Sequence, residues 1–225
     1  MTTTQGPAPQ TVGILLFPDV EILDFFGPFH VFSRAALPPR TEGGPERWLF
    51  TVIGIAETAD PIVSRAGPSL GGEGRGLLVQ PHATLHDHPP LDIVVVPGGP
   101  GTWPVLERQV VLDWIAAQHQ AGVLTTSVCT GAFLLGAVGL LEGKRATTHG
   151  LFTEELRQRR PETEVVSDVR VVDEGQIVTS AGVSAGIDMA LHVVARLHGA
   201  EIARRTARFM EYEWTAAAQT SSRRG

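Results

Sequence analysis

The stretch TTSVCTGAFLLG, residues 125–136, joins an apolar strand pattern to a helix of small residues, and it contains the only cysteine of the chain. The run VLTTSV (123–128) predicts a buried strand, and Gly131–Leu141 predicts a helix. A strand, a sharp turn that carries a reactive residue, and a helix together form a nucleophile elbow. The sequence therefore places Cys129 on such a turn, with small residues on both sides.

Strand and helix patterns alternate outward from this elbow. The clearest strand is LDIVVVPGGPG (91–101), a β-branched run that ends in proline and paired glycines. Further strands are expected at 11–17, 48–56 and 77–79, the last after the loop GGEGRG (71–76), and twice within 165–180 around the turn DEG. A helix is expected within 23–36, with Pro28 in its first turn and running on toward Ala36. Further helices are expected at 110–122, closed by Gly122, at 153–160, and at 184–210 as one long or two broken helices. This alternation predicts an α/β fold, a doubly wound and mostly parallel sheet sandwiched by helices in a single domain.

Length and composition agree with one globular domain. The chain has 225 residues, of which 43% are hydrophobic and 19% charged. We expect a disordered polar tail at 1–10, the domain at 11–214 and a C-terminal tail at 215–225. The polar start shows no export signal, and the longest apolar-looking run is far shorter than the roughly 20 residues that span a bilayer. A cytoplasmic protein with no membrane partner is expected.

Charge and cysteine usage narrow the class of partner. The formal net charge is −6, whereas phosphate binding needs clustered lysine and arginine, so no nucleic-acid partner is expected. One cysteine excludes an internal disulfide and fits a reducing compartment. A small-molecule substrate and a second copy of the chain are the partners that we expect.

The position of Cys129 suggests a nucleophile. Unpaired N–H groups at a helix N-terminus stabilise a thiolate, so the thiol pKa is expected to lie below its usual value of about 8.5. A buried cysteine that only fills space is the structural alternative. The local pattern leaves both interpretations open.

Two other segments end at the same edge of the predicted sheet. The glycines of the PGG run, Gly98 and Gly99, can bring backbone N–H groups close to a developing negative charge. Asp24 follows the first strand and can act as a general acid if it reaches the thiol. Glu21 is the competing carboxylate, and the residues alone do not decide between the two.

Four motifs carry a resemblance to a known family: FPDVEILDFFGP (17–28), VVVPGG (94–99), SVCTGAFLLGAVGLLEGKRATTH (127–149) and SAGVSAGIDMAL (180–191). Together they resemble the ThiJ/PfpI family of the class I glutamine amidotransferase-like fold, and within it the isonitrile hydratases. The resemblance extends from Val12 to about Tyr212. It implies a flavodoxin-like sandwich, usually homodimeric, with a cysteine nucleophile, a nearby acid, and neither a metal nor an organic cofactor.

The resemblance also assigns roles. It implies that Cys129 is the nucleophile, that Asp24 rather than Glu21 is its acidic partner, and that the N–H groups of Gly99 and Thr130 line an oxyanion pocket. The implied reaction is hydration of an isonitrile to an N-substituted formamide through a thioimidate. His149, which lies 20 residues beyond the cysteine, is a further candidate to tune the thiolate or serve a structural role.

Two departures from the family pattern bear on the substrate. Relatives commonly carry tryptophan after T-T-H, where this chain has Gly150, and its absence is expected to widen the pocket. Relatives also tend to continue past E-Y with a proline-rich stretch, whereas this chain reads Glu211-Tyr212-Glu213-Trp214 and ends soon after.

Other functions compete with the hydratase. A glyoxalase-like activity on small carbonyls would use the same thiol and acid, although Thr130 stands where such branches often carry histidine. A ligand-sensing or redox-sensing domain, related to the sensor modules of AraC-type regulators, is the non-enzymatic alternative. His82, His86 and His88 beside Asp87 suggest a metal site, but their proline-flanked segment favours a surface connection, and no metal is expected.

Overall fold

A mixed sheet of eight strands lies between two layers of helices in the computed structural model, which describes residues 8–39, 44–65, 76–215 and 220–222. From edge to edge the strands are β14 (Thr220–Ser222), β12 (Val171–Asp173), β13 (Ile177–Ser180), β9 (Leu124–Val128), β8 (Ile93–Val96), β1 (Gln10–Leu16), β4 (Phe50–Ala56) and β7 (Ala83–Thr84). β12 pairs antiparallel with β13 and parallel with β14, and all other neighbours pair in parallel. The expected mostly parallel α/β sheet is confirmed.

The five central parallel strands follow the flavodoxin-like order. In space they run β4-β1-β8-β9-β13, so the first strand of the chain lies between the second and the third. The direction of winding therefore reverses between β1 and β8. In sheets of this kind, ligands bind outside the carboxyl ends of the strands at such a reversal.

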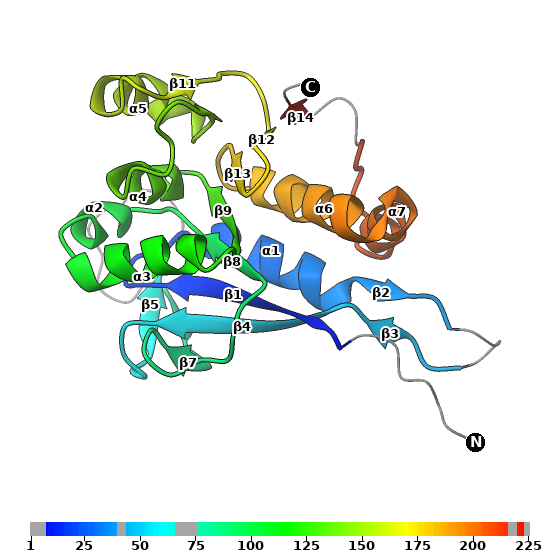
Figure 1. Ribbon diagram of the computed structural model, residues 1–225. Helices are drawn as coiled ribbons and strands as arrows, with labels where there is room; N and C mark the ends of the chain where they lie inside the picture. The colour runs from blue at the N-terminus through cyan, green and yellow to red at the C-terminus, as the bar shows by residue number, and fades with distance from the viewer. Residues whose placement is uncertain (1–7, 40–43, 66–75, 216–219, 223–225) are drawn as a thin grey trace.

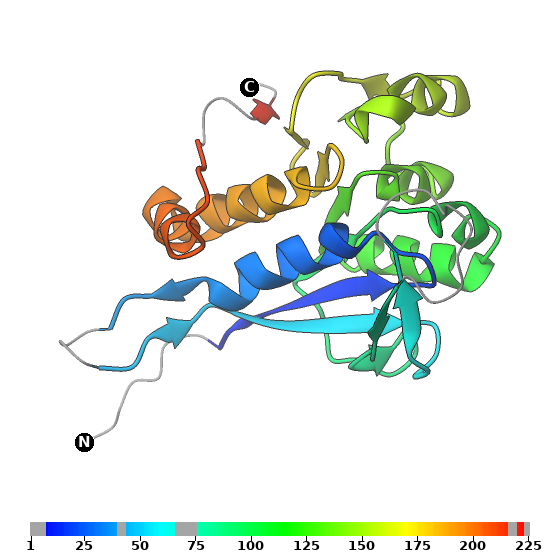
Figure 2. The same ribbon diagram turned by 180° about the vertical axis from the view of Figure 1, so that it is seen from behind.

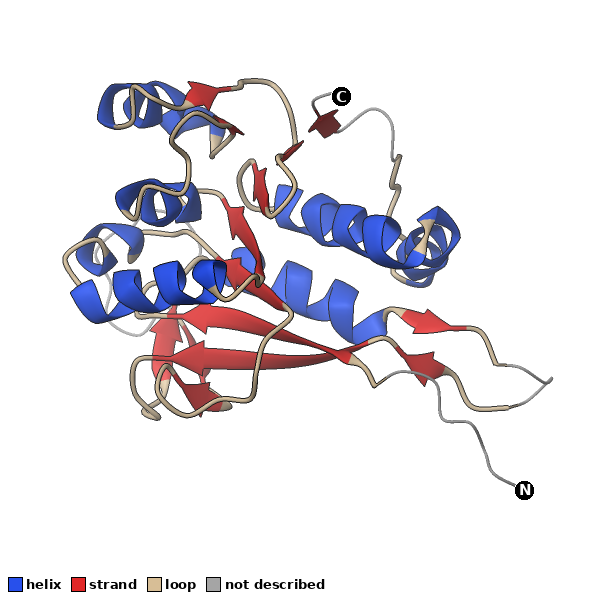
Figure 3. Cartoon of the chain, in the orientation of Figure 1, coloured by secondary structure: helices blue, strands red, loops and turns tan. Residues whose placement is uncertain are grey.

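Helices cover both faces of the sheet (Figures 1, 2 and 3). One layer holds α1 (Ile22–Arg34), α6 (Ala185–His198) and α7 (Ala200–Phe209), and the other holds α2 (Thr102–Val105), α3 (Gln109–Gln120) and α4 (Gly131–Ala137). The smaller elements are β2 (Ala36–Leu37) with β3 (Arg47–Trp48), β5 (Ile62–Ser64) with β6 (Leu77–Val79), β10 (Arg145–Ala146) with β11 (Glu164–Val165), η1 (Gly150–Phe152) and α5 (Thr153–Arg159). No helix in the described ranges is long and apolar enough to cross a membrane.

Apolar burial and glycine explain the main boundaries. All four residues of β8 are buried, as expected for a strand covered on both faces. Gly122, with φ +87°, ends α3 by donating its N–H to the carbonyl of His119. Gly199, with φ +92°, separates α6 from α7, so the C-terminal region forms two helices rather than one.

Three expected boundaries were wrong. α1 begins at Ile22, because backbone hydrogen bonds fix the preceding loop, and Pro28 therefore lies inside the helix rather than in its first turn. α4 ends at Ala137 instead of Leu141, since Gly139 turns the chain with φ +75°. The expected strand at 48–56 is divided between β3 and β4.

The remaining expectations concern the two ends of the chain and the GGEGRG loop. Gln10, expected in the N-terminal tail, begins β1, and β14 lies within the expected C-terminal tail, where it pairs with β12. Residues 71–75 of the GGEGRG loop lie outside the described residues, while the strand expected after them is present as β6.

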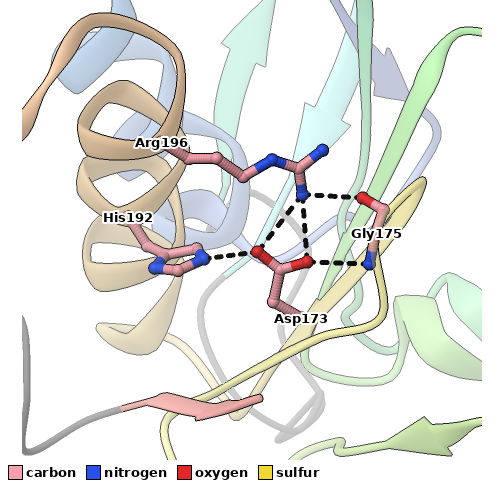
Figure 4. Close-up of polar contacts among 4 residues, drawn as sticks. All are labelled: Asp173, Gly175, His192 and Arg196. Carbon is pink, nitrogen blue, oxygen red and sulfur yellow. Dashed lines mark hydrogen bonds and ion pairs between the residues drawn. The ribbon is translucent and has the colours of Figure 1, made fainter. Parts of the chain in front are cut away.

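A polar cluster joins α6 to the turn between β12 and β13 (Figure 4). Asp173 lies 2.7 Å from Nε2 of His192 and accepts a hydrogen bond of 2.9 Å from Nη1 of Arg196. Arg196 also donates to the carbonyl of Gly175, whose own N–H donates to Asp173. The helix and the hairpin are thus connected by one half-buried carboxylate.

Candidate active site

Cys129 lies at the turn between β9 and α4, as expected of an elbow. Its φ of +58° is in the left-handed region, which a non-glycine residue adopts only when its surroundings hold it there. Its N–H is shared between the carbonyls of Ser180 and Ala181, and its carbonyl accepts a 2.7 Å hydrogen bond from Oγ1 of Thr148. A side chain at Gly131 would overlap the carbonyl oxygen of Val96, so only glycine lets α4 start here.

Asp24 reaches the thiol from the first turn of α1. Its side chain is fully buried, and Oδ2 accepts a hydrogen bond of 2.9 Å from the N–H of Gly98. Cys129 and Val183 lie close enough to this carboxyl group to lower its pKa, although its Oδ1 accepts no hydrogen bond from the described residues. Three segments that are distant in the sequence therefore meet at one carboxyl.

Burial raises the pKa of Asp24 to about 7. The hydrogen bond from Gly98 opposes this rise, the charge of Glu21 adds to it, and the contacts with Val183 and Cys129 lower it. A carboxyl group with a pKa near neutrality can both accept and return a proton during a reaction.

The thiol does not have the lowered pKa expected from its place at a helix N-terminus. Burial raises the pKa of Cys129, the neighbouring charge of Asp24 raises it further, and only hydrogen bonds from Thr130 act in the opposite direction. The side chain is 5% exposed, so water that would stabilise the thiolate is excluded. Cys129 and Asp24 thus form an acid–base pair in which the thiol holds its proton.

The glycines after β8 are required by close packing. A Cβ atom on Gly98 would lie 2.5 Å from the backbone nitrogen of Thr130, and one on Gly99, which has φ +126°, would overlap the nitrogen of Glu21. The N–H of Gly98 donates to Asp24, and that of Gly99 donates to Oγ1 of Thr130 at 3.0 Å. Both N–H groups already have acceptors, and the role of Gly99 in an oxyanion pocket stays a prediction.

Thr130 connects these parts. Its hydroxyl lies 2.8 Å from that of Thr102 and accepts the N–H of Gly99. The residue therefore orients the loop after β8. Thr130 also lowers the pKa of the neighbouring thiol, while its role in an oxyanion pocket stays a prediction.

A cavity of about 430 Å³ opens above Cys129. Its wall is largely apolar and includes Trp103, Leu151, Phe152 and Val183. Trp103 packs edge-on against Phe133 at 5.1 Å between ring centroids and tilts against Phe152 at 5.7 Å. The cavity can hold a small apolar molecule against the thiol.

Of the two candidate residues after Thr148, His149 lines this cavity and Gly150 does not. His149 lines it, with Nδ1 accepting the N–H of Leu151 at 3.2 Å and the ring packed against Gly182. Gly150 is exposed, its Cβ position has no atom within 4 Å, and it is not part of the cavity wall. The space left by the absence of tryptophan at position 150 therefore lies beside the cavity wall and not inside the cavity.

Sequence reasoning missed several wall residues. Val183 is β-branched yet has φ +53°, and its place between glycines in SAGVSAG was the available signal. Trp103 lies two residues beyond the PGGPG run, which marks its loop as part of the site. Leu151 and Phe152 had no signal beyond their proximity to His149.

Two of the three histidines in the segment 82–88 accept hydrogen bonds from distant parts of the chain. Nδ1 of His82 accepts the N–H of Gly54 at 3.0 Å, and Nε2 of His88 accepts the indole N–H of Trp114 at 2.9 Å. Within the described residues, no three histidine, cysteine or carboxylate side chains are grouped so that they could hold a metal ion.

Comparisons with known proteins identify the family and the fold. A profile of the DJ-1/PfpI family matches residues 10–196. The isonitrile hydratase of Pseudomonas putida is 37% identical over 201 residues, which cover 89% of this chain and 78% of that protein. The crystal structure of a ThiJ/PfpI family protein from Pseudomonas syringae matches with a TM-score of 0.75 and 26% identity, over 96% of this chain and 83% of the other.

A regulator is also among the relatives. The HTH-type transcriptional regulator GbdR of Pseudomonas aeruginosa is 29% identical over 181 residues, which cover 73% of this chain and 48% of the regulator. The chain thus spans about half the length of that protein. The family resemblance found in the sequence is confirmed, and the relatives include both an enzyme and a regulator.

Proposed function

Since the chain belongs to the DJ-1/PfpI family, we propose that it is a cysteine-dependent isonitrile hydratase, which converts an isonitrile and water to an N-substituted formamide. The observation that carries this proposal is the placement of the buried Asp24 carboxyl beside Cys129, where the N–H of Gly98 holds it and burial raises its pKa to about 7. The similarity to an isonitrile hydratase gives the reaction class.

In the first step, Sγ of Cys129 attacks the terminal carbon of R–N≡C. Asp24 accepts the thiol proton as the C–S bond forms and then donates it to the same carbon, which gives the thioimidate R–N=CH–S. The apolar wall excludes bulk water, which would otherwise compete for this proton. Thr130, which lowers the pKa of Cys129, stabilises the negative charge that develops on the sulfur as its proton leaves.

In the second step, one water molecule adds across the C=N bond of the thioimidate, with its oxygen bonding to the carbon and one of its protons ending on the nitrogen. The C–S bond then breaks, the sulfur recovers a proton, and R–NH–CHO is released. Asp24 can take a proton from the attacking water and return one to the departing sulfur, because its pKa lies near neutrality. The cycle consumes one isonitrile and one water and regenerates the thiol.

The test is formamide production from cyclohexyl isocyanide by wild-type, Cys129→Ala, Cys129→Ser and Asp24→Asn proteins. Glu21→Gln is the matched control, because Glu21 is a second carboxylate on the same cavity. We expect turnover to vanish in the two Cys129 variants and to fall steeply in Asp24→Asn, with a smaller effect in Glu21→Gln. A folded wild-type protein that leaves the isonitrile unchanged would refute the proposal.

A ligand-sensing role is the second candidate, favoured by the similarity to a transcriptional regulator. To separate this role from a glyoxalase-like activity, the same proteins are also assayed with methylglyoxal, the substrate of a glyoxalase-like enzyme. Turnover of methylglyoxal alone would support that enzyme class, whereas inertness toward both compounds would favour the sensor.

A further inference from the structure

A second cavity, of about 440 Å³, lies at the carboxyl ends of β1 and β4. Its floor is formed by buried apolar side chains, among them Phe17, Ile62 and Val105. It is as large as the cavity above Cys129, and the proposed hydration does not use it. Its size and apolar floor suit a small molecule.

The rim of this cavity carries more negative than positive charge. Glu57 is paired with Arg108, whose Nε lies 3.2 Å from Oε2, and Asp19 is paired with Arg65. Asp60 accepts a hydrogen bond of 3.1 Å from Oγ1 of Thr58, and no arginine, lysine or histidine of the described ranges forms an ion pair with it. A cationic group at the rim would therefore meet an uncompensated carboxylate.

Two loops separate this cavity from the cavity above Cys129. In the loop 17–21, Asp19 faces the second cavity and Glu21 the first; in the loop 97–101, Gly101 faces the second and Gly99 the first. The two cavities therefore lie on the two sides of the same pair of loops.

The loops are locked together through their backbones. The N–H of Glu21 donates to the carbonyl of Gly98 at 2.8 Å, and that of Gly101 donates to the carbonyl of Asp19 at 3.1 Å. A side chain at Gly101 would overlap the carbonyl oxygen of Pro18. Because no side chain cushions this contact, a shift of one loop displaces the other, including the N–H of Gly98 that holds Asp24.

We propose that the second cavity binds a small amine with an apolar body, its hydrocarbon part on Phe17, Ile62 and Val105 and its ammonium group beside Asp60, and that its occupancy changes the reactivity of Cys129 through the two loops. The floor supplies the affinity by burial of hydrocarbon, and the rim supplies the preference for a cation. This inference is independent of the hydratase reaction.

Binding is tested by titrating ¹⁵N-labelled protein with cyclohexylmethylamine and with the neutral cyclohexylmethanol. We expect saturable shifts of the amides of Ile62, Val105 and Arg108, with the amine binding more tightly than the alcohol. Asp60→Asn should weaken amine binding roughly two- to fivefold, the range of an exposed ion pair. The exposed, distant Glu201→Gln is the matched control and should leave the affinity unchanged.

Any of four results would overturn the binding site. They are shifts centred on Trp103 and Phe152 instead, equal affinity for amine and alcohol, equal effects of the two variants, and absence of saturable binding of either compound.

The coupling is tested by the rate at which iodoacetamide alkylates Cys129, followed by intact mass at fixed pH. Saturation with the amine should change this rate about fivefold or more, a typical coupling between sites. In Pro61→Trp, where an exposed residue of the cavity wall is enlarged, the amine should have no effect. An alkylation rate that stays constant in amine-saturated wild-type protein would refute the coupling.

Discussion

The backbone N–H of Gly98 donates a 2.9 Å hydrogen bond to Oδ2 of Asp24, although 74 positions separate the two residues in the sequence. The bond crosses the point where the sheet reverses its winding, from the loop after β8 to the first turn of α1. It fixes the carboxyl group beside the thiol of Cys129. The reaction proposed for this protein depends on that placement.

The rate of the proposed hydration should depend on pH through Asp24. The ionised carboxylate accepts the thiol proton, so kcat/KM should rise as the pH increases through about 7, the raised pKa of Asp24, and level off above it. In Asp24→Asn the rate should fall about 10²- to 10⁴-fold and lose this pH dependence. A wild-type profile that is flat between pH 5 and 9 would show that another group transfers the proton.

Asp24→Asn should also stabilise the protein at alkaline pH. The pKa of Asp24 rises from 3.8 to about 7 on folding, so between these values the folded chain keeps a proton that the unfolded chain has released, and stability falls as the pH rises through this window. The neutral amide removes this penalty, while its oxygen can still accept the N–H of Gly98. Urea unfolding at pH 8 should show a gain of up to a few kcal/mol, and at pH 4 almost none. Asp113→Asn, on the exposed face of α3, is the control and should show no such difference.

Gly98→Ala should disrupt both the site and the fold. The added Cβ atom would lie 2.5 Å from the backbone nitrogen of Thr130, which cannot rotate away. We expect a loss of about 1–3 kcal/mol in the free energy of unfolding, together with loss of turnover. Gly150→Ala has no atom within 4 Å of the new methyl group and should change stability by less than about 0.5 kcal/mol. Equal effects of the two substitutions would contradict the close packing described for the loop.

Asp173→Asn should weaken the connection between α6 and the β12–β13 hairpin. The pKa of Asp173 is lowered because hydrogen bonds from His192 and Gly175 and the charge of Arg196 outweigh its burial. A carboxylate with a lowered pKa stabilises the fold above its unfolded value of 3.8, and the contribution is lost as the pH falls through the lower folded pKa. Thermal unfolding at pH 7 should reveal a loss of about 1–3 kcal/mol. At a pH below the folded pKa, the variant and the wild type should have nearly the same stability.

The family, the fold class and the thiol were predictable from the sequence, because each depends on local pattern. Alternating apolar runs gave the order of strands and helices, and the small residues around Cys129 indicated the elbow. Gly122 and Gly199 end their helices through their own backbone conformations, which are properties of single residues. Asp24 was named by family resemblance, since the local pattern did not separate it from Glu21.

The protonation of the site was decided by tertiary structure alone. A helix N-terminus next to Cys129 predicted a thiol with a lowered pKa, yet burial and the carboxyl of Asp24 raise it. Desolvation and charge act through space, so they depend on which segments meet rather than on which residues are neighbours in the chain. For the same reason, the sequence supplied the thiol and the acid, while only folding placed Val183 and Trp103 on the cavity wall and assigned the N–H of Gly98 to Asp24.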